Sequence, residues 1–198
     1  MKKTIAILGV IALAALVLPL AAGAVVEPKT QTEYPDAAVM DLSDGAVSLK
    51  VTGVGLREKT FMKVDVYTIV SYVGDGLEGS DIMAFDGPKR LQMDLRRGFS
   101  REKLVASFSE TIEKNFEDMS AFETDMAVFL AYFDRDAQEA DRIVFDFAPG
   151  AGLTTSLNGE VKGIIDNTAF AQALWSVWFG QKPANGDLKK ALISELGD

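Results

Sequence analysis

Residues 53–73, GVGLREKTFMKVDVYTIVSYV, form the stretch that decides the fold. Gly53 and Gly55 give a backbone that is free to turn tightly. After Arg57, apolar and polar residues alternate, which predicts a half-buried β-strand. Residues 46–54 alternate in the same way, so we expect the two strands to pair as an antiparallel hairpin through a turn at residues 55–60. This hairpin would place Arg57 at one end of the sheet.

The rest of the chain alternates between strand patterns and helix patterns. Apolar residues recur with a period of two at 89–96, 142–148 and 153–165, and the last segment contains the hairpin signal Asn158-Gly159. Four segments share an apolar period near four, which predicts helices. The first, 100–116, is capped by Ser100, and the second, 120–133, begins with a capping box at Ser120. The third runs through Phe170 and ends at Gly180, and the fourth, 186–196, is capped by Asn185. The order of strands, two helices, strands and two helices predicts an α+β domain with an antiparallel sheet and helices on one face. Trp175 and Trp178 lie three residues apart on an apolar helix, so we expect both in the core.

The N-terminus has the three parts of a secretory signal peptide. Lys2 and Lys3 precede an apolar run at 5–20, and Ala22-Gly23-Ala24 forms a small-residue cleavage site. We therefore expect a bacterial Sec-type signal peptide at 1–24, cleavage after Ala24, and a periplasmic or secreted protein without stable membrane insertion. The alternative is an uncleaved anchor, because residues 5–26 carry no charge and could span a bilayer. After the leader, a polar, irregular lead-in is expected at 25–44 and a single domain at 45–197.

Composition excludes several kinds of partner and site. A net charge of −9 argues against nucleic acid and against anionic membrane surfaces as partners. The chain has no cysteine and no histidine, so it lacks disulfides, the commonest general base and the commonest metal ligand, and we predict no metal and no cofactor. The acidic residues at 134–141 lack the glycine and the ligand spacing of a calcium loop, so we expect a solvated turn there.

Three motifs in this order resemble the chalcone isomerase superfamily, and in particular its secreted bacterial chalcone-isomerase-like branch. They are the turn Gly53-Val54-Gly55-Leu56-Arg57 with the strand that contains Val66-Tyr67 and Tyr72-Val73, then Leu157-Asn158-Gly159, and finally the ending Leu174-Trp175-Ser176-Val177-Trp178-Phe179-Gly180 followed by Lys182-Pro183 and Leu188-Lys189-Lys190-Ala191-Leu192. The resemblance covers roughly residues 45–197. It implies the chalcone isomerase fold, an open-faced β-sandwich with a large antiparallel sheet covered by helices on one face.

The resemblance also implies a ligand site. In this superfamily the arginine of the turn, here Arg57, points into a cleft and binds the anionic end of a ligand, which suits a planar guanidinium. Tyr67 matches the position at which fatty-acid-binding members have a tyrosine that helps hold the carboxylate. The expected pocket wall consists of Tyr72, Phe99 and Phe108. The implied function is non-catalytic binding of a fatty acid or a similar small amphipathic or aromatic acid.

Two alternatives remain open from the sequence. One is an intramolecular isomerase of the chalcone–flavanone type, with Arg57 as the catalytic residue that holds the oxyanion. The resemblance places Phe99 where that enzyme has a ketone-polarising tyrosine and Glu102 near its lysine, and neither can supply the required hydrogen-bond donor or positive charge. The other is an interaction module that binds a protein partner and no small ligand.

Overall fold

The computed structural model describes residues 23–59 and 64–197, so nearly all of the predicted signal peptide lies outside the described residues. The strands are β1 (Ala24–Glu27), β2 (Thr32–Pro35), β3 (Ala37–Leu42), β4 (Gly45–Lys59), β5 (Val64–Val73), β6 (Lys89–Leu95), β7 (Arg142–Ala148), β8 (Gly152–Leu157) and β9 (Glu160–Ile165). The helices are α1 (Arg101–Asn115), α2 (Glu123–Ala131), α3 (Thr168–Phe179) and α4 (Gly186–Ala191). None of the helices in this part of the chain is long and apolar enough to cross a membrane.

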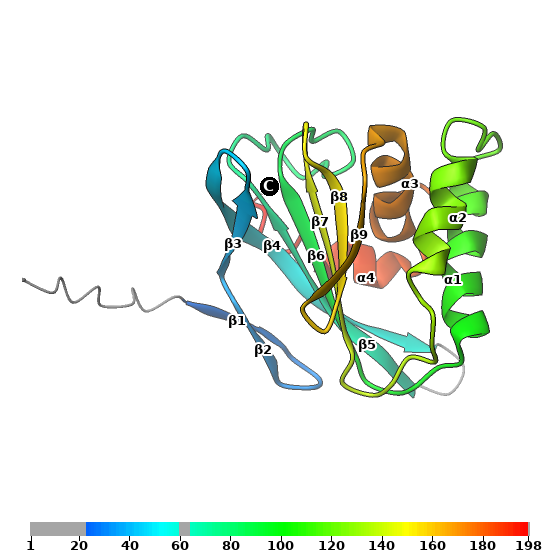
Figure 1. Cartoon of the computed structure of the whole chain (residues 1–198). Helices are drawn as coiled ribbons and strands as arrows, with labels where there is room; N and C mark the ends of the chain where they lie inside the picture. Colours follow the sequence, from blue (N-terminus) through cyan, green and yellow to red (C-terminus); the bar gives the residue numbers. More distant parts are fainter. Residues whose placement is uncertain (1–22, 60–63, 198) are drawn as a thin grey trace, which may run out of the picture.

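Strands β3 to β9 form one antiparallel sheet of seven strands in sequence order. The sheet is curled, and α1, α2 and α3 lie on one of its faces (Figure 1). The two-stranded β1–β2 hairpin lies at the other side of the molecule, next to β3 and β4 (Figure 1). The α+β class, with a large antiparallel sheet covered by helices on one face, is therefore confirmed (Figure 1).

The sheet separates two hydrophobic cores. The larger one lies between the sheet and the helices and contains interlocking aromatic rings, among them Phe108, Phe129, Phe145 and Trp178. The smaller one lies on the opposite face and is built around Tyr34, whose hydroxyl hydrogen-bonds to Thr68 and donates to Asp94. Because successive residues of a strand point to opposite faces, each central strand supplies both cores.

Residues 25–44 are not the irregular lead-in that the sequence predicted. They form β1, β2 and β3, and β3 is an edge strand of the large sheet. Strands of four residues are too short to show a clear alternation, and Pro28 and Pro35 resemble loop signals. The burial of Tyr34, which is only 2% exposed, explains why this segment nevertheless packs on the sheet.

The first hairpin also differs from the prediction. Residues 55–59 continue β4 and do not turn; β4 and β5 are joined by residues 60–63, which lie outside the described residues. Gly53 and Gly55 serve a different purpose, because α4 packs directly against them. A Cβ on Gly53 would overlap the carbonyl oxygen of Ala191, and a Cβ on Gly55 would lie 2.6 Å from Cδ1 of Leu188. These glycines therefore allow a helix to approach a strand closely.

The end of the chain is fixed on this same part of β4. A β-bulge at Thr52 directs its hydroxyl to the carbonyl oxygen of Leu192 at 2.8 Å, and the backbone N–H of Glu195 donates to the Thr52 carbonyl at 3.0 Å. Asn185 caps α4 as predicted, by accepting from the N–H of Leu188. The helix ends at Ala191, before the predicted residue 196, because the following backbone groups turn to pair with Thr52.

Only one of the two predicted caps of the long helices is present. Ser100 caps α1 and accepts from the N–H of Lys103. The predicted capping box at Ser120 does not form, since α2 begins at Glu123 and its N-cap is Phe122, which has no polar side chain. Phe122 is buried against the rings of Phe116 and Phe170, so packing in the core positions this helix start.

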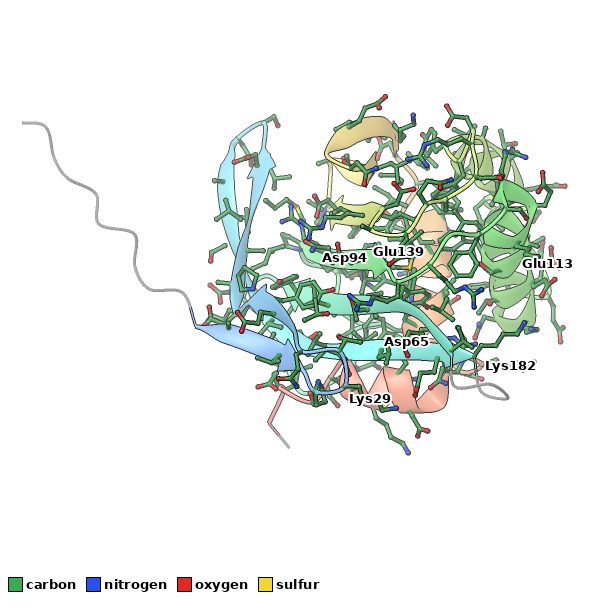
Figure 2. The ribbon with its side chains drawn as sticks, turned by 90° about the horizontal axis from the view of Figure 1, so that it is seen from below. Lys29, Asp65, Asp94, Glu113, Glu139 and Lys182 are labelled. Atoms are coloured by element: carbon green, nitrogen blue, oxygen red, sulfur yellow. The ribbon has the colours of Figure 1, made fainter. Side chains whose placement is uncertain are left out.

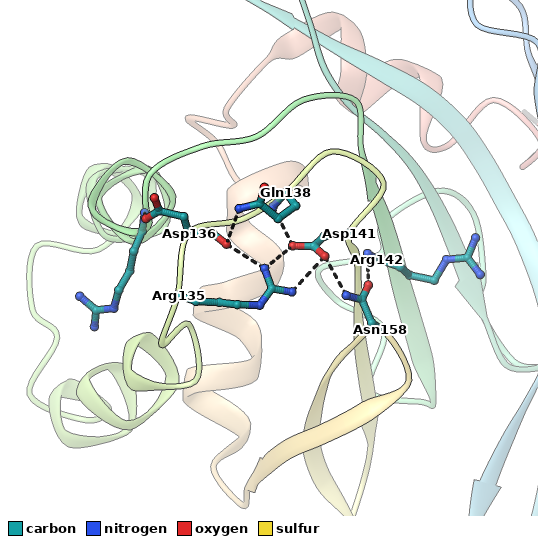
Figure 3. A network of polar contacts seen from close by, with 7 residues as sticks. Arg135, Asp136, Gln138, Asp141, Arg142 and Asn158 are labelled. Carbon is teal, nitrogen blue, oxygen red and sulfur yellow. Dashed lines mark hydrogen bonds and ion pairs between the residues drawn. The ribbon is translucent and has the colours of Figure 1, made fainter.

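The acidic segment before β7 is only in part the solvated turn that was predicted. Asp134, Asp136 and Glu139 are exposed, but Asp141 is buried in an ordered network (Figure 3). Asp141 is 6% exposed and accepts hydrogen bonds from both terminal nitrogens of Arg135, from the N–H of Gln138 and from the amide of Asn158. Burial alone would raise the pKa of Asp141, but these three donors together lower it to about 2. The network fastens the start of β7 to the β8–β9 turn. No group of three or more potential metal ligands occurs within residues 23–59 and 64–197.

Candidate functional site

A cleft of about 540 Å³ opens between the helix-covered face of the sheet, α1 and the segment that follows α3. The ends of β4, β5 and β6 form its floor, one face of α1 forms a side wall, and Lys182, Pro183 and Ala184 form the opposite rim. Seen from below, Lys182 lies at the end of the long β4–β5 strands, and Glu113 points away from α1 on its outer side (Figure 2). Residues from both ends of the domain thus meet at this cleft.

The structure brings Arg57 and Tyr67 together in the cleft. They are directly opposite each other on β4 and β5, and such cross-strand pairs have Cβ atoms roughly 5 Å apart. One terminal nitrogen of Arg57 donates to the carbonyl oxygen of Glu58 at 2.6 Å. No carboxylate among the described residues forms an ion pair with the guanidinium. Its remaining donors can therefore serve a ligand.

The hydroxyl of Tyr67 is held in a defined orientation by Trp178. The indole N–H of Trp178 donates to the Tyr67 oxygen at 3.0 Å. Burial raises the pKa of Tyr67 to about 12, although the hydrogen bond from Trp178 and the charge of Arg57 act in the opposite direction. Tyr67 is thus neutral near pH 7. Because an indole N–H can only donate, the Tyr67 oxygen accepts, and its own proton is left to donate to another acceptor.

The wall around this pair is mainly apolar. Phe99 and Phe108 line the cleft, as expected from the sequence, together with Met93, Leu95 and Leu104. Trp178 also lines it, so this tryptophan is both the buried core residue that was expected and part of the ligand wall, which was the alternative for this residue.

Tyr72 does not line the cleft, and its predicted place in the pocket wall is wrong. It belongs to the smaller core on the other face of the sheet, where its hydroxyl donates to the carbonyl oxygen of Pro35. Tyr67 and Tyr72 are five positions apart on one strand, and an odd separation places two side chains on opposite faces. The sequence contained this signal.

The sequence reading missed the positive charge of the cleft. Besides Arg57, the lining residues include Lys59, Lys103, Lys114 and Lys182, whereas Glu110 is the only carboxylate among the described lining residues. The four lysines are exposed and come from three separate segments of the chain, so no local sequence pattern brings them together. In a chain with 20 basic and 29 acidic residues, this excess of positive charge is local to the cleft.

Glu102 lies outside the cleft lining, which bears on the isomerase alternative. Its neighbour Lys103 does line the cleft. The cation of Lys103 therefore lies on the side of the cleft where the resemblance placed Glu102. Phe99 remains a lining residue without a hydrogen-bond donor, and Tyr67 is the only tyrosine among the described residues of the lining.

Comparison with known proteins agrees with this fold. A search of the solved structures finds a fatty-acid binding protein of Arabidopsis thaliana, AtFAP1, with a TM-score of 0.68 and 17% sequence identity, over 86% of this chain and 96% of that one. No curated protein matches the chain. The sequence model of the family described as chalcone isomerase-like matches residues 31–194, which include β3 to β9 and all four helices. The chain therefore belongs to the chalcone isomerase-like family.

Proposed function

We propose that this protein is a non-catalytic binder of a fatty acid or a similar amphipathic acid. The observation that carries the proposal is the Arg57–Tyr67 pair: a guanidinium and a neutral hydroxyl that still has a proton to donate lie side by side in a mainly apolar cleft. A carboxylate accepts from both kinds of donor at once. The apolar wall then surrounds the chain that the carboxylate carries.

The size and lining of the cleft support this function over a ligand-free interaction module. A domain that served only as a protein partner would be expected to fill the space next to Arg57, but here the cleft has a volume of about 540 Å³. Each buried CH₂ group contributes about 0.8 kcal/mol to binding. A chain of a dozen carbons that was only partly buried would therefore bind with useful affinity. The fatty-acid binding named for the Arabidopsis protein of the same fold agrees with this reading.

The isomerase alternative has weaker support. Arg57 could hold an oxyanion, and Lys103 adds a cation to the cleft. However, Phe99 occupies the place where the resemblance predicts a ketone-polarising tyrosine, and a phenyl ring donates no hydrogen bond. Tyr67, with a pKa near 12, is a hydrogen-bond donor and a poor general base at neutral pH.

The test is native mass spectrometry of the protein purified without residues 1–24, followed by denaturing extraction of whatever has co-purified. Wild type, Arg57→Ala and Arg96→Ala are compared after incubation with dodecanoate. Arg96 is an exposed arginine that does not line the cleft, so it is the matched control. Binding by wild type and Arg96→Ala, with loss in Arg57→Ala, is the expected result. A wild-type protein that takes up no fatty acid would overturn the proposal.

We also propose that the protein acts in the periplasm or outside the cell, on the basis of the signal peptide at 1–24. Expression of the full chain in a bacterium, followed by cell fractionation and intact-mass measurement, tests this point. The expected product is a periplasmic or secreted protein that starts at residue 25. A full-length protein in the membrane fraction would instead support the uncleaved anchor.

A further inference from the structure

An asparagine joins the backbone of one cleft lysine, Lys182, to the end of the helix that carries another, Lys114. Lys114 is in the last turn of α1, and Asn115 follows it. The side chain of Asn115 donates to the carbonyl oxygen of Lys182 at 3.0 Å and accepts from its N–H at 2.9 Å. The backbone of Lys182 is thereby fastened to the end of α1, beside Lys114. Both lysines line the cleft.

Positive charge is in excess around this pair among the described residues that line the cleft. Neither Lys114 nor Lys182 forms an ion pair there, whereas Lys50 and Lys190, which lie outside the cleft, pair with Asp75 and Asp187. Glu110, one turn before Lys114 on α1, also lines the cleft but forms no ion pair with either lysine. Like charges in one cleft repel each other, and a cleft in which one sign of charge predominates concentrates the field of that sign. The natural occupant of this position is an anion.

The lysine pair is separate from the Arg57–Tyr67 pair. Trp178, which holds Tyr67, packs against Phe108, near the middle of α1. Lys114 is six residues further along the helix, or about 9 Å at 1.5 Å per residue. The backbone of Lys114 therefore lies nearly two helical turns from the level of Phe108, where Trp178 holds Tyr67. The lining between them is provided partly by Val177 and Trp178, which are apolar.

We propose that the cleft has a second anion subsite, formed by Lys114 and Lys182, and that its preferred ligands carry two anionic groups joined by an apolar segment. This inference rests on the proposed function, because the first carboxylate is the one held by Arg57 and Tyr67. The second group is a carboxylate or a phosphate, since an ammonium binds either as a point charge. The ligand class is therefore a long-chain dicarboxylate or an acyl chain that ends in a phosphate.

The experiment compares three ligands that share one chain length: dodecanedioate, 12-phosphododecanoate and 12-hydroxydodecanoate, whose far end is uncharged. Affinities are measured by isothermal titration calorimetry at low and high salt for three proteins. These are wild type, the double variant Lys114→Gln/Lys182→Gln, and the control Lys50→Gln/Lys190→Gln, which removes the same charge outside the cleft.

For wild type and the control, we expect at least one dianionic ligand to bind roughly two- to tenfold more tightly than 12-hydroxydodecanoate, the range of one or two exposed ion pairs. This preference should shrink at high salt, because exposed charges are screened. The Lys114→Gln/Lys182→Gln variant should lose the preference and keep its affinity for 12-hydroxydodecanoate. Which of the two dianions gains more identifies the second group.

The outcomes separate this inference from the proposed function. If wild type binds all three ligands equally, or if the lysine variant keeps the preference, the second subsite is disproved while acid binding stands. If wild type binds neither these three ligands nor dodecanoate, both the proposed function and the second subsite are disproved.

Discussion

Replacement of Gly53 by alanine should destabilise the protein severely through the contact between β4 and α4. The added Cβ would overlap the carbonyl oxygen of Ala191 and lie 2.6 Å from the carbonyl carbon of Leu192, where carbon atoms normally keep about 3.5–4.0 Å. Both neighbours are backbone atoms, so the end of α4 has to move. This movement breaks the two hydrogen bonds of Thr52 with Leu192 and Glu195, about 1 kcal/mol each. Strain of about 1–3 kcal/mol is added, for a total of about 3–5 kcal/mol.

Gly55 provides a contrast, because its neighbours are side-chain atoms. A Cβ there would meet Cδ1 of Leu188 at 2.6 Å and Cβ of Ala191 at 3.0 Å. In Leu188→Ala the conflicting methyl group is absent, so the cost of Gly55→Ala should be smaller in that background than in wild type. Gly53→Ala should not be relieved in this way. Gly186→Ala is the control, since a Cβ at Gly186, in the first turn of α4, meets nothing within 4 Å.

The assay is urea denaturation followed by tryptophan fluorescence, which gives the free energy of unfolding of each variant. We expect Gly186→Ala to be neutral or slightly stabilising, because alanine favours a helix over glycine. If Gly53→Ala lost less than about 1 kcal/mol, the close approach of α4 would not be the reason for glycine at this position. Equal costs of Gly55→Ala in the wild-type and Leu188→Ala backgrounds would refute the steric reasoning at the second glycine.

Three further predictions concern buried polar groups. Burial lowers the pKa of Lys89 to about 8, below its ordinary 10.5, so the unfolded state binds more protons than the folded state between these two pH values. The free energy of unfolding should therefore rise from about pH 8 to pH 9.5. Lys89→Met should flatten this rise, as measured by urea titrations at each pH. The pKa of Asp141 is lowered to about 2, so Asp141→Asn should cost about 2 kcal/mol at pH 7, a difference that shrinks as the pH falls from 4 towards 2. Tyr67→Phe should weaken dodecanoate binding at least about tenfold in calorimetry, because it removes a hydrogen bond to a charged group.

The first two of these predictions have control variants, and the third has an outcome that would contradict it. For Lys89→Met it is Lys50→Met, an exposed lysine whose loss should leave the pH dependence unchanged. For Asp141→Asn it is Asp134→Asn, whose carboxylate is largely exposed and lies 3.7 Å from its lysine partner; an equal loss in both would contradict the role of burial. For Tyr67→Phe, an unchanged affinity would show that the hydroxyl does not contact the ligand.

The fold was predictable because its strands and helices have clear periods. The alternation in residues 89–96, the Asn158-Gly159 turn and the Ser100 cap all appear where the sequence placed them. The elements that were missed depend on contacts distant in sequence. β1 and β2 are held by burial of Tyr34, and the start of α2 is fixed by packing of Phe122, which no local propensity encodes.

The candidate site was predictable in part, and through the family resemblance. The resemblance named Arg57 and Tyr67, whereas a hairpin that turned at 55–60 would have put Arg57 in the turn; the two residues are opposite each other because β4 continues to Lys59. The role of Trp178 could not be predicted, because its hydrogen bond to Tyr67 joins residues 111 positions apart. The lysines of the cleft come from segments whose relative positions depend on how α1 and α3 pack. Because these lysines come together only in the folded structure, no local sequence pattern predicts their cluster.

The hydrogen bond from Thr52 to Leu192 spans 140 residues, and it has a consequence for the order of folding. Contacts between such distant positions form slowly, because a long loop must close first. The rim that carries Lys182 lies between α3 and α4. Asn115 of α1 holds the Lys182 backbone on one side, and the C-terminal segment that docks on β4 holds the rim on the other. A chain that ended before α4 could still build its sheet and most of its core. It would resemble the finished protein by circular dichroism and yet have a cleft whose rim is held on one side only, so the affinity for ligand reports whether the C-terminal segment has docked.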